Sequence, residues 1–296
     1  MSHYIVTGGA GFIGSNLVQS LEEGGHSVLV LDNLSTGSVD NLADCPPLAL
    51  RKSRAGSIPE WDSPPDGIFH LGIPSSPYLY REDRKYCAIA IQDWIDILEY
   101  AKKWSTKVVF ASTSSLYNGV PKPFYEDRII EVKDFYTEVR LHMERLGKLY
   151  YDFYGVKNIA LRLFGVFGEH EEAKKEFANV VTQMMWAKRE DKPFEIWGKG
   201  NQTRDLVYVK DVVRAFRIAM DSLLEYGIYN VGNGVEWSFN KMAKTVGCKV
   251  EFISNPMQNY VERTKAHTSL ARDKLGFSPI YRVEEQILRL SRGQEG

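Results

Sequence analysis

The sequence predicts an α/β protein built on a doubly wound parallel sheet, with a smaller, interleaved α/β region toward the C-terminus. In the first half, short apolar runs rich in β-branched residues alternate with segments whose apolar residues recur at helical spacing, which is the pattern of repeated strand–helix units. After residue 163 this rhythm changes to shorter, mixed elements. No linker or low-complexity tract separates the two regions, so we expect one body with a cleft between them.

The expected elements follow from these runs. The predicted strands of the first half are residues 4–6, 28–31, 48–51, 67–71, 107–111 and 158–163, and its clearest helices are residues 87–104 and 135–154. Farther along the chain we expect a helix over 173–188, a strand over 194–197, a loop over 198–205, a helix over 209–224 and a strand over 228–231. Because sheets of this kind bind ligands at the carboxyl ends of their strands, the residues that follow each strand are the candidates for a site.

The first strand leads into a turn with glycines at positions 8, 11 and 14, and a helical pattern begins beyond it. Gly8 permits a tight turn, Gly11 lets backbone N–H groups approach a pyrophosphate, and Gly14 lets the helix pack closely on the strand. The second strand ends in Asp32, whose carboxylate accepts hydrogen bonds from the adenosine ribose and repels a 2′-phosphate. Glycines alone would also fit an ordinary strand–turn–helix, but with these flanks the motif predicts dinucleotide binding, with NAD favoured over NADP.

Composition narrows the class of partner. The 296 residues carry a formal net charge of −1, which gives no reason to expect nucleic acid or an anionic membrane as a partner. Three scattered cysteines, Cys45, Cys87 and Cys248, lack metal-ligand spacing and fit a reducing compartment. The first strand starts almost at the first residue, and no apolar run approaches membrane-spanning length. We therefore expect a cytoplasmic protein with no metal site.

Seven segments, in order along the chain, carry a resemblance to a known family. They are TGGAGFIG (7–14), FHLGI (69–73), VVFASTSSLYN (108–118), LRLFGVFG (161–168), GKGNQTRDLVYVKDVVRA (198–215), YNVGNG (229–234) and ARDKLGFSP (271–279). Over nearly its whole length, the chain resembles the extended short-chain dehydrogenase/reductase family in its nucleotide-sugar epimerase and dehydratase branch. The resemblance implies a Rossmann fold, NAD as cofactor and a nucleotide sugar as substrate, with UDP favoured. It also implies an NAD-binding domain formed by residues 1–164 and 206–232 and a substrate-binding region formed by residues 165–205 and 233–296.

The same resemblance implies the catalytic residues. The family's catalytic Ser/Thr corresponds to Thr113, and its Tyr-x-x-x-Lys motif corresponds to Tyr136 through Arg140, so an arginine replaces the lysine. A tyrosine that acts as a base near neutral pH needs about 4 kcal/mol of preferential stabilisation of its phenolate. A cation one helical turn away and the positive nicotinamide ring together supply it. Arg140 keeps the charge but is longer and planar, so we expect its position to differ from that of a lysine.

The resemblance and the strand ends together predict a set of binding residues. The predicted cofactor-binding residues are Gly8, Gly11, Phe12, Ile13, Gly14, Asp32, Asn33, Ser35, Gly37, Ser57, Ile58, Leu71, Gly72, Ile73, Tyr136 and Arg140. The predicted substrate-binding residues are Thr113, Ser114, Asn179 and Arg204. For Arg204 a solvated loop position, and for Asn179 a helix-surface position, are the plain alternatives. His70, which follows a buried strand, is expected to be structural rather than a proton carrier.

Several positions depart from the family pattern. The family's dehydratases place an Asp–Glu pair directly after the catalytic Thr, whereas this chain has Ser114 and Ser115, which lack acid–base strength. Two family asparagines correspond to Ala90 and Gly165, and an arginine that grips the diphosphate corresponds to Met257. The sequence thus predicts an NAD-dependent epimerase, like those that interconvert UDP-glucose and UDP-galactose, working through a transient 4-keto intermediate. The alternatives are a catalytically degenerate NAD- or nucleotide-sugar-binding protein and a net sugar-nucleotide oxidoreductase.

The resemblance also bears on assembly. In the family, the helices that correspond to residues of about 87–104 and 135–154 pack against a second copy in a four-helix seam, so we expect a homodimer. Trp94, Ile95 and Leu98 recur at helical spacing and fit either the core or that seam, because spacing does not distinguish the two.

Overall fold

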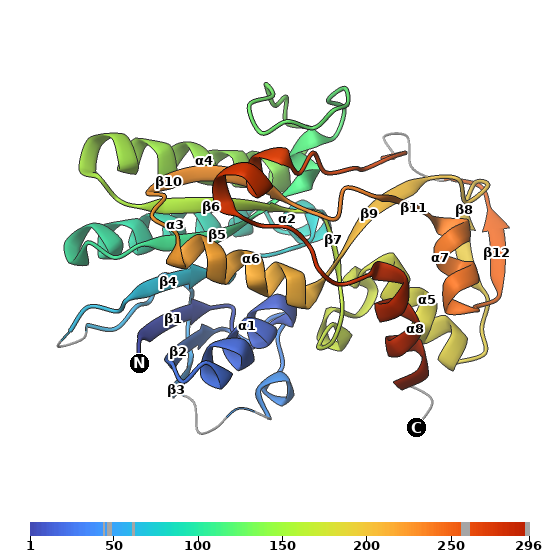
Figure 1. Ribbon diagram of the computed structural model, residues 1–296, viewed down its shortest axis with the longest axis horizontal. Helices are drawn as coiled ribbons and strands as arrows, with labels where there is room; N and C mark the ends of the chain where they lie inside the picture. Colours follow the sequence, from blue (N-terminus) through green and yellow to red (C-terminus); the bar gives the residue numbers. More distant parts are fainter. Residues whose placement is uncertain (44, 46–48, 61–62, 256–260, 294–296) are drawn as a thin grey trace.

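The larger part of the molecule is a seven-stranded sheet in the order β10–β6–β5–β4–β1–β2–β3 (Figure 1). In the computed structural model, the described residues are 1–43, 45, 49–60, 63–255 and 261–293. The strands are β1 (His3–Thr7), β2 (Ser27–Asp32), β3 (Ala49–Lys52), β4 (Gly67–His70), β5 (Val108–Thr113), β6 (Asn158–Leu163) and β10 (Tyr226–Val231). Every neighbouring pair is parallel, so the carboxyl ends of the strands lie along one edge.

Helices cover both faces of this sheet. On one face α1 (Phe12–Glu23) packs beside α6 (Val209–Asp221), and on the other α3 (Lys85–Trp104) packs beside α4 (Phe135–Tyr154) (Figure 1). The adjacent residues Ile5 and Val6 of β1 are both fully buried and belong to the separate cores under these two layers, since successive side chains of a strand point to opposite faces. A strand buried on both faces reads as a continuous apolar run. The predicted doubly wound α/β fold is confirmed.

The C-terminal region is built from smaller units. A three-stranded sheet in the order β11–β9–β7 lies beside a two-stranded parallel pair of β8 and β12. These strands are β7 (Gly165–Phe167), β8 (Phe194–Trp197), β9 (Thr203–Tyr208), β11 (Glu236–Ser238) and β12 (Val250–Ile253), and the helices around them are α5 (Val180–Arg189), α7 (Phe239–Val246) and α8 (Val283–Gly293). The short helix α2 (Pro77–Glu82) follows β4. The chain returns to the large sheet with β10. The division into an NAD-binding domain (1–164 and 206–232) and a substrate-binding region (165–205 and 233–296) stays a prediction.

Several predicted elements need correction. The helix predicted over 173–188 is instead a 3₁₀ segment, Glu172–Phe177, followed by α5. The two are separate because Lys175 has a non-helical backbone, with φ 49° and ψ −128°, and because the side chain of Asn179 caps α5 by accepting the N–H of Val181. The loop predicted over 198–205 ends early, since β9 starts at Thr203 and contains Arg204. The predicted helix over 209–224 ends at Asp221. Leu48, the first residue of the third predicted strand, lies outside the described residues.

The long helices α3 and α4 contribute large side chains to the core. Trp94 and Leu98 are fully buried, and the indole N–H of Trp94 donates to the backbone oxygen of Met143 on α4 (2.9 Å). These two residues therefore belong to the core rather than to an outer seam. Across the described part of the chain, none of the helices combines the length and the apolar character that crossing a bilayer demands.

Candidate active site

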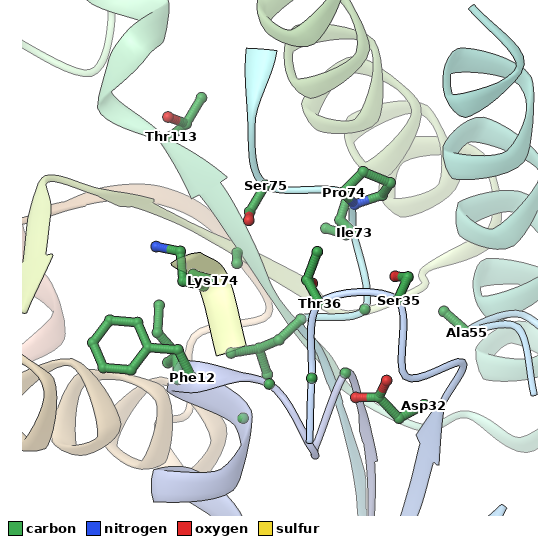
Figure 2. Close-up of a pocket in the computed structure, with 18 of the residues that line it drawn as sticks. Phe12, Asp32, Ser35, Thr36, Ala55, Ile73, Pro74, Ser75, Thr113 and Lys174 are labelled. Carbon is green, nitrogen blue, oxygen red and sulfur yellow. The ribbon is translucent and has the colours of Figure 1, made fainter. Parts of the chain in front are cut away.

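A cavity of about 440 Å³ opens at the carboxyl ends of β1, β2, β4 and β5 (Figure 2). The strand order reverses between β1 and β4, and ligands of doubly wound sheets bind at such a reversal. Gly8 and Leu71, which follow these two strands, both line the cavity. The fold therefore places the site where the strand ends predict it.

The glycine turn closes one wall of this cavity with backbone alone. Gly8 has φ +70°, and a Cβ at this position would lie 2.6 Å from the backbone nitrogen of Gly72. A Cβ at Gly14 would lie 2.0 Å from the carbonyl oxygen of Gly8. The helix α1 begins at Phe12, and its N-cap residue Gly11 gives no side-chain cap. The N-terminal N–H groups of α1 thus receive no side-chain cap from Gly11 and face a space that suits an anionic group.

Asp32 ends β2 at the far end of the same wall. Its Oδ2 accepts the backbone N–H of Ala10 (2.9 Å), and its Oδ1 accepts that of Leu34 (2.7 Å). These bonds fix the carboxylate at the cavity edge, and each oxygen keeps acceptor capacity. A cradle that excludes side chains, an uncapped helix start and a fixed carboxylate are the features that a dinucleotide requires. The residues present therefore fit NAD, held by the glycine turn at its pyrophosphate and by Asp32 at its adenosine ribose.

Most of the predicted site residues meet in this cavity. The predicted residues that line it are Gly8, Gly11, Phe12, Ile13, Gly14, Asp32, Asn33, Ser35, Gly37, Leu71, Gly72, Ile73, Thr113, Tyr136, Arg140 and Asn179. Ser57, Ile58, Ser114 and Arg204 lie outside its lining. Sequence reasoning did not single out several lining residues, among them Thr36, Ser53, Arg54, Lys174 and Phe177. Pro74 and Ser75 also line the cavity; they belong to the segment after the fourth strand, where the sequence places candidates, but they are not among the predicted binding residues.

Thr113 and Tyr136 are fixed by the starts of two helices. Thr113 ends β5, and its Oγ1 accepts the backbone N–H of Ser115 (3.1 Å), so its own O–H stays available as a donor. Tyr136 is the second residue of α4. That helix begins with a capping box, in which the Asp134 carboxylate accepts the N–H of Thr137 (2.8 Å). The cap sets the first turn of α4 and so sets where the nearly buried ring of Tyr136 enters the cavity.

Arg140 lies one turn along α4 and is 3% exposed. Its two terminal nitrogens donate to the backbone oxygens of Ala111 (2.7 Å) and Pro74 (3.1 Å), and its guanidinium carbon lies 5.1 Å from the centre of the Tyr136 ring. The Nε of Arg140 is buried and has no hydrogen-bond partner among the described residues. Arg140 thus ties the end of β5 to the loop after β4 and places a positive charge beside Tyr136.

A buried polar layer lies beneath this end of the cavity. Ser112 lines the cavity, and its hydroxyl donates to the Glu144 carboxylate (2.5 Å). Glu144 in turn forms a two-point ion pair with Arg162 (2.7 and 3.0 Å), and both side chains are almost fully buried. Such a pair is costly to break, because removing one partner leaves a buried charge unpaired. The layer therefore holds β5, α4 and β6 in a fixed relation under Thr113 and Tyr136.

His70 is fully buried at the end of β4, in accord with its expected structural role. Its Nδ1 is 2.7 Å from the hydroxyl of Thr7, and its ring stacks on Trp94 with 5.5 Å between ring centres. Burial, reinforced by the positive charge of Arg140, lowers the pKa of His70 to about 3. The imidazole is therefore uncharged at physiological pH.

Two of the predicted substrate-binding residues, Asn179 and Arg204, lie in different places. Asn179 lines the cavity, but its side chain also caps α5 and donates to the Val166 oxygen (3.0 Å). Arg204 lies in β9 and donates to the Val261 oxygen (2.8 Å). Its guanidinium carbon lies 5.3 Å from the centre of the Phe239 ring. Met257, the position of a family arginine, falls outside the described residues. The structure thus brings Asn179, but not Arg204, to the wall of the cavity.

The fold and this cavity define an α/β dinucleotide-binding protein with a hydroxyl, a tyrosine and a buried cation at the reacting end. The model of the NAD dependent epimerase/dehydratase family matches residues 4–232, and the chain belongs to that family. A relative from Methanocaldococcus jannaschii, provisionally named a UDP-glucose 4-epimerase, is 31% identical over 297 residues, which cover 97% of this chain and 96% of the relative.

Solved structures agree with this assignment over the whole chain. The UDP-N-acetylglucosamine 4-epimerase of Methanobrevibacter ruminantium, in complex with UDP-N-acetylmuramic acid, is 26% identical with a TM-score of 0.91, covering 98% of this chain and 97% of that one. The UDP-glucose 4-epimerase of Thermotoga maritima with UDP-glucose is 27% identical with a TM-score of 0.88 and the same coverage. The UDP-glucose 4-epimerase of Thermus thermophilus in complex with NAD is 27% identical with a TM-score of 0.86, covering 99% of each chain.

Proposed function

We propose that this protein is an NAD-dependent epimerase that inverts carbon 4 of a UDP-linked sugar through a transient 4-keto intermediate. One observation carries the proposal: Thr113 and Tyr136 line the same cavity as the glycine turn and Asp32. The acid–base pair and the dinucleotide cradle therefore share one enclosed space. The names of the relatives, which include UDP-sugar 4-epimerases, support UDP as the nucleotide.

Each residue has a distinct part in this reaction. When bound, NAD accepts a hydride from the sugar and returns it, so no net oxidation occurs. The Tyr136 phenolate takes the proton of the 4-hydroxyl and gives it back after the sugar has turned over. Thr113 donates its free O–H to the same oxygen, since its lone pair already accepts the N–H of Ser115. The guanidinium carbon of Arg140, 5.1 Å from the centre of the tyrosine ring, places a positive charge beside Tyr136.

The residues after Thr113 favour epimerisation over dehydration. Ser114 and Ser115 stand where the family's dehydratases have an Asp–Glu pair, and hydroxyls do not provide general acid and base strength near pH 7. The 4-keto sugar therefore has no group at these positions to remove water from it. Reduction on its other face is the remaining step.

The experiment is direct. NAD-loaded protein is incubated with UDP-glucose and, separately, with UDP-galactose, and the products are resolved by proton NMR of the anomeric signals. The same equilibrium mixture should form from both sides. UDP-N-acetylhexosamines and other nucleotide sugars complete the panel, and the absence of interconversion across all of them would contradict the proposal.

One observation favours a second candidate, a protein that binds NAD or a nucleotide sugar without turnover. The guanidinium of Arg140 is committed to two backbone oxygens, whereas the family's lysine at this position binds the nicotinamide ribose. A binding protein would leave its cofactor unchanged when a nucleotide sugar is added. Transient NADH absorbance on mixing excludes this candidate, and steady release of NADH would instead indicate a net oxidoreductase.

We also infer that the protein is a cytoplasmic homodimer whose seam is formed by α3 and α4. Four large side chains on α4 remain exposed, Phe135 (48%), Leu149 (47%), Phe153 (74%) and Tyr154 (57%), and exposed apolar groups that gather on one helix often mark an interface. The sparse cysteines fit a reducing cytoplasm. Light scattering after size exclusion should give twice the chain mass, and Phe153→Asp should shift it toward the monomer; a wild-type monomer would contradict the inference.

A further inference from the structure

Three cationic side chains line the described cavity, namely Arg54, Arg140 and Lys174. Arg54 forms an ion pair with Asp93 (2.7 Å) and lies 3.3 Å from Asp96. Arg140 donates to two backbone oxygens. Arg54 and Arg140 thus bind other parts of the protein. Lys174 is the cation of this set that lies at the glycine-turn wall, next to Phe12.

Lys174 stands between the starts of two helices. Its Nζ lies 5.4 Å from the ring centre of Phe12, the first residue of α1. The same Nζ donates to Oε1 of Glu171 (3.1 Å), and this oxygen also accepts the backbone N–H of Asn179, the N-cap of α5 (2.7 Å). In Figure 2, Lys174 lies between Phe12 and Thr113, on the opposite side of the view from Asp32. The ammonium thus lies near both helix starts.

The partner of Lys174 leaves part of its hydrogen-bonding capacity unused. Glu171 is fully buried, and its second oxygen accepts the hydroxyl of Thr182 (2.6 Å). An ammonium has three N–H donors, and Glu171 takes one of them. The Lys174 side chain remains 21% exposed and lines the cavity. Glu171 therefore holds the ammonium in place while leaving donors for a ligand.

We propose that Lys174 binds the diphosphate group of a ligand, beside the α1 N-terminus. The inference rests on the proposed function, which brings two diphosphates to this cavity, the pyrophosphate of NAD and the diphosphate of the UDP-sugar. Both present the same chemistry: phosphate oxygens that accept charge-assisted hydrogen bonds from an ammonium and from backbone N–H groups. Lys174 lies near the start of α1 and, through Glu171, near the start of α5. Either diphosphate is therefore a candidate ligand, and binding measurements distinguish the two.

The experiment measures NAD and UDP binding separately by isothermal titration calorimetry, with the cofactor first removed from the purified protein. Lys174→Met should weaken binding in at least one arm by about tenfold or more, the scale of a lost charged hydrogen bond. Lys174→Arg keeps the charge and should stay within about threefold of wild type. Lys175→Met is the matched control, because Lys175 is adjacent but outside the cavity lining, and it should bind like wild type.

The two titrations show which diphosphate Lys174 binds. Loss in the NAD arm identifies the cofactor pyrophosphate, loss in the UDP arm identifies the substrate diphosphate, and loss in both identifies a shared contact. Lys174→Met with wild-type affinity in both arms, or with the same loss as Lys175→Met, overturns the proposal.

A second variant separates ligand binding from folding. Lys174→Met alone leaves the buried Glu171 carboxylate without its cation, so the double variant Glu171→Gln/Lys174→Met removes the pair as a unit, and its melting curve reports whether the fold survives. A folded double variant should show the same loss of binding, and wild-type affinity there would overturn the proposal. These outcomes are independent of turnover: a wild-type protein that binds NAD and UDP but epimerises nothing contradicts the proposed function alone.

Discussion

The two ends of the cavity are built from different materials. At the cofactor end the wall is mostly backbone: the turn around Gly8, the uncapped start of α1 and one fixed carboxylate, Asp32. At the reacting end, Tyr136 stands over buried ionisable side chains, with Arg140 beside it and the Glu144–Arg162 pair beneath. The shape of the cofactor end thus depends on steric limits at the backbone. The shape of the reacting end depends on long side chains whose partners come from distant parts of the chain.

This difference predicts where each end is sensitive. A backbone wall tolerates changes of surrounding side chains but not an added Cβ, because the space for the ligand is the space that the glycines leave open. A site built on buried charges responds to the loss of a single polar atom, since each buried group depends on its partner. Variants at the two ends should therefore fail in different ways, one in cofactor affinity and the other in turnover.

The largest expected effect is at the reacting end. Tyr136→Phe removes the proton-transferring hydroxyl and keeps the ring that packs on Tyr80, so turnover should fall by about 100-fold or more while the melting temperature and NAD affinity stay near wild type. Initial rates of UDP-galactose conversion and calorimetric titration with NAD measure the two quantities. Tyr86→Phe, which removes another cavity-lining phenol, is the control and should keep most of its activity. Equal activity of Tyr136→Phe and wild type would exclude this tyrosine as the base.

The next effect is at the cofactor end. Asp32→Asn keeps the size of the side chain but removes the charge that repels a 2′-phosphate and weakens its hydrogen bonds to the ribose. NAD affinity should fall by about tenfold, the scale of one charge-assisted hydrogen bond, and the preference for NAD over NADP should fall with it. Titration of both dinucleotides gives the ratio. An unchanged ratio would show that something other than Asp32 selects the cofactor.

The sequence was sufficient for the backbone end and for the large sheet. The strands that run through the core read as apolar segments because both of their faces are buried, as Ile5 and Val6 are. The turn at Gly8 was predictable because its positive φ of +70° is a local requirement that glycine meets without strain. The family match confirms the fold and the class of protein, whereas the roles of individual site residues stay predictions.

The sequence was not sufficient for the side-chain contacts of Arg140 or for the position of Lys174. Arg140 contacts the backbone of Ala111 and of Pro74, which are 29 and 66 positions away along the chain, and no spacing pattern encodes such contacts. Lys174 belongs to a charged run that resembles a solvated helix face. The break at Lys175 turns that run into a 3₁₀ segment and brings Lys174 to the cavity. Long side chains and irregular backbone thus limit what periodicity predicts.

A third variant tests whether Arg140 acts on the cofactor or on the framework. Arg140→Met should lower NAD affinity by about tenfold, the scale of one charge-assisted hydrogen bond, because it removes a buried cation from the lining of the cavity. Arg140→Lys keeps the charge and should retain much of the turnover, although one ammonium does not reproduce the planar, two-point contact of a guanidinium. If Arg140→Met leaves NAD affinity and turnover unchanged and only lowers the melting temperature, Arg140 serves the framework alone.

A last effect is confined to stability in acid and comes from His70, next to the same buried charges. Its pKa is about 3 in the folded protein and about 6.5 in an unfolded chain. Above pH 6.5 neither state binds the proton, so folding bears no penalty. As the pH falls from about 6.5 toward 3, the unfolded chain binds a proton that the buried imidazole does not, and the free energy of unfolding drops by up to about 1.4 kcal/mol per pH unit.

Urea denaturation between pH 7 and pH 4 should show a shallower decline in the free energy of unfolding for His70→Asn than for wild type. His142→Asn, at a partly exposed position on α4, should leave the slope unchanged, and equal slopes for wild type and His70→Asn would show that the acid sensitivity arises elsewhere.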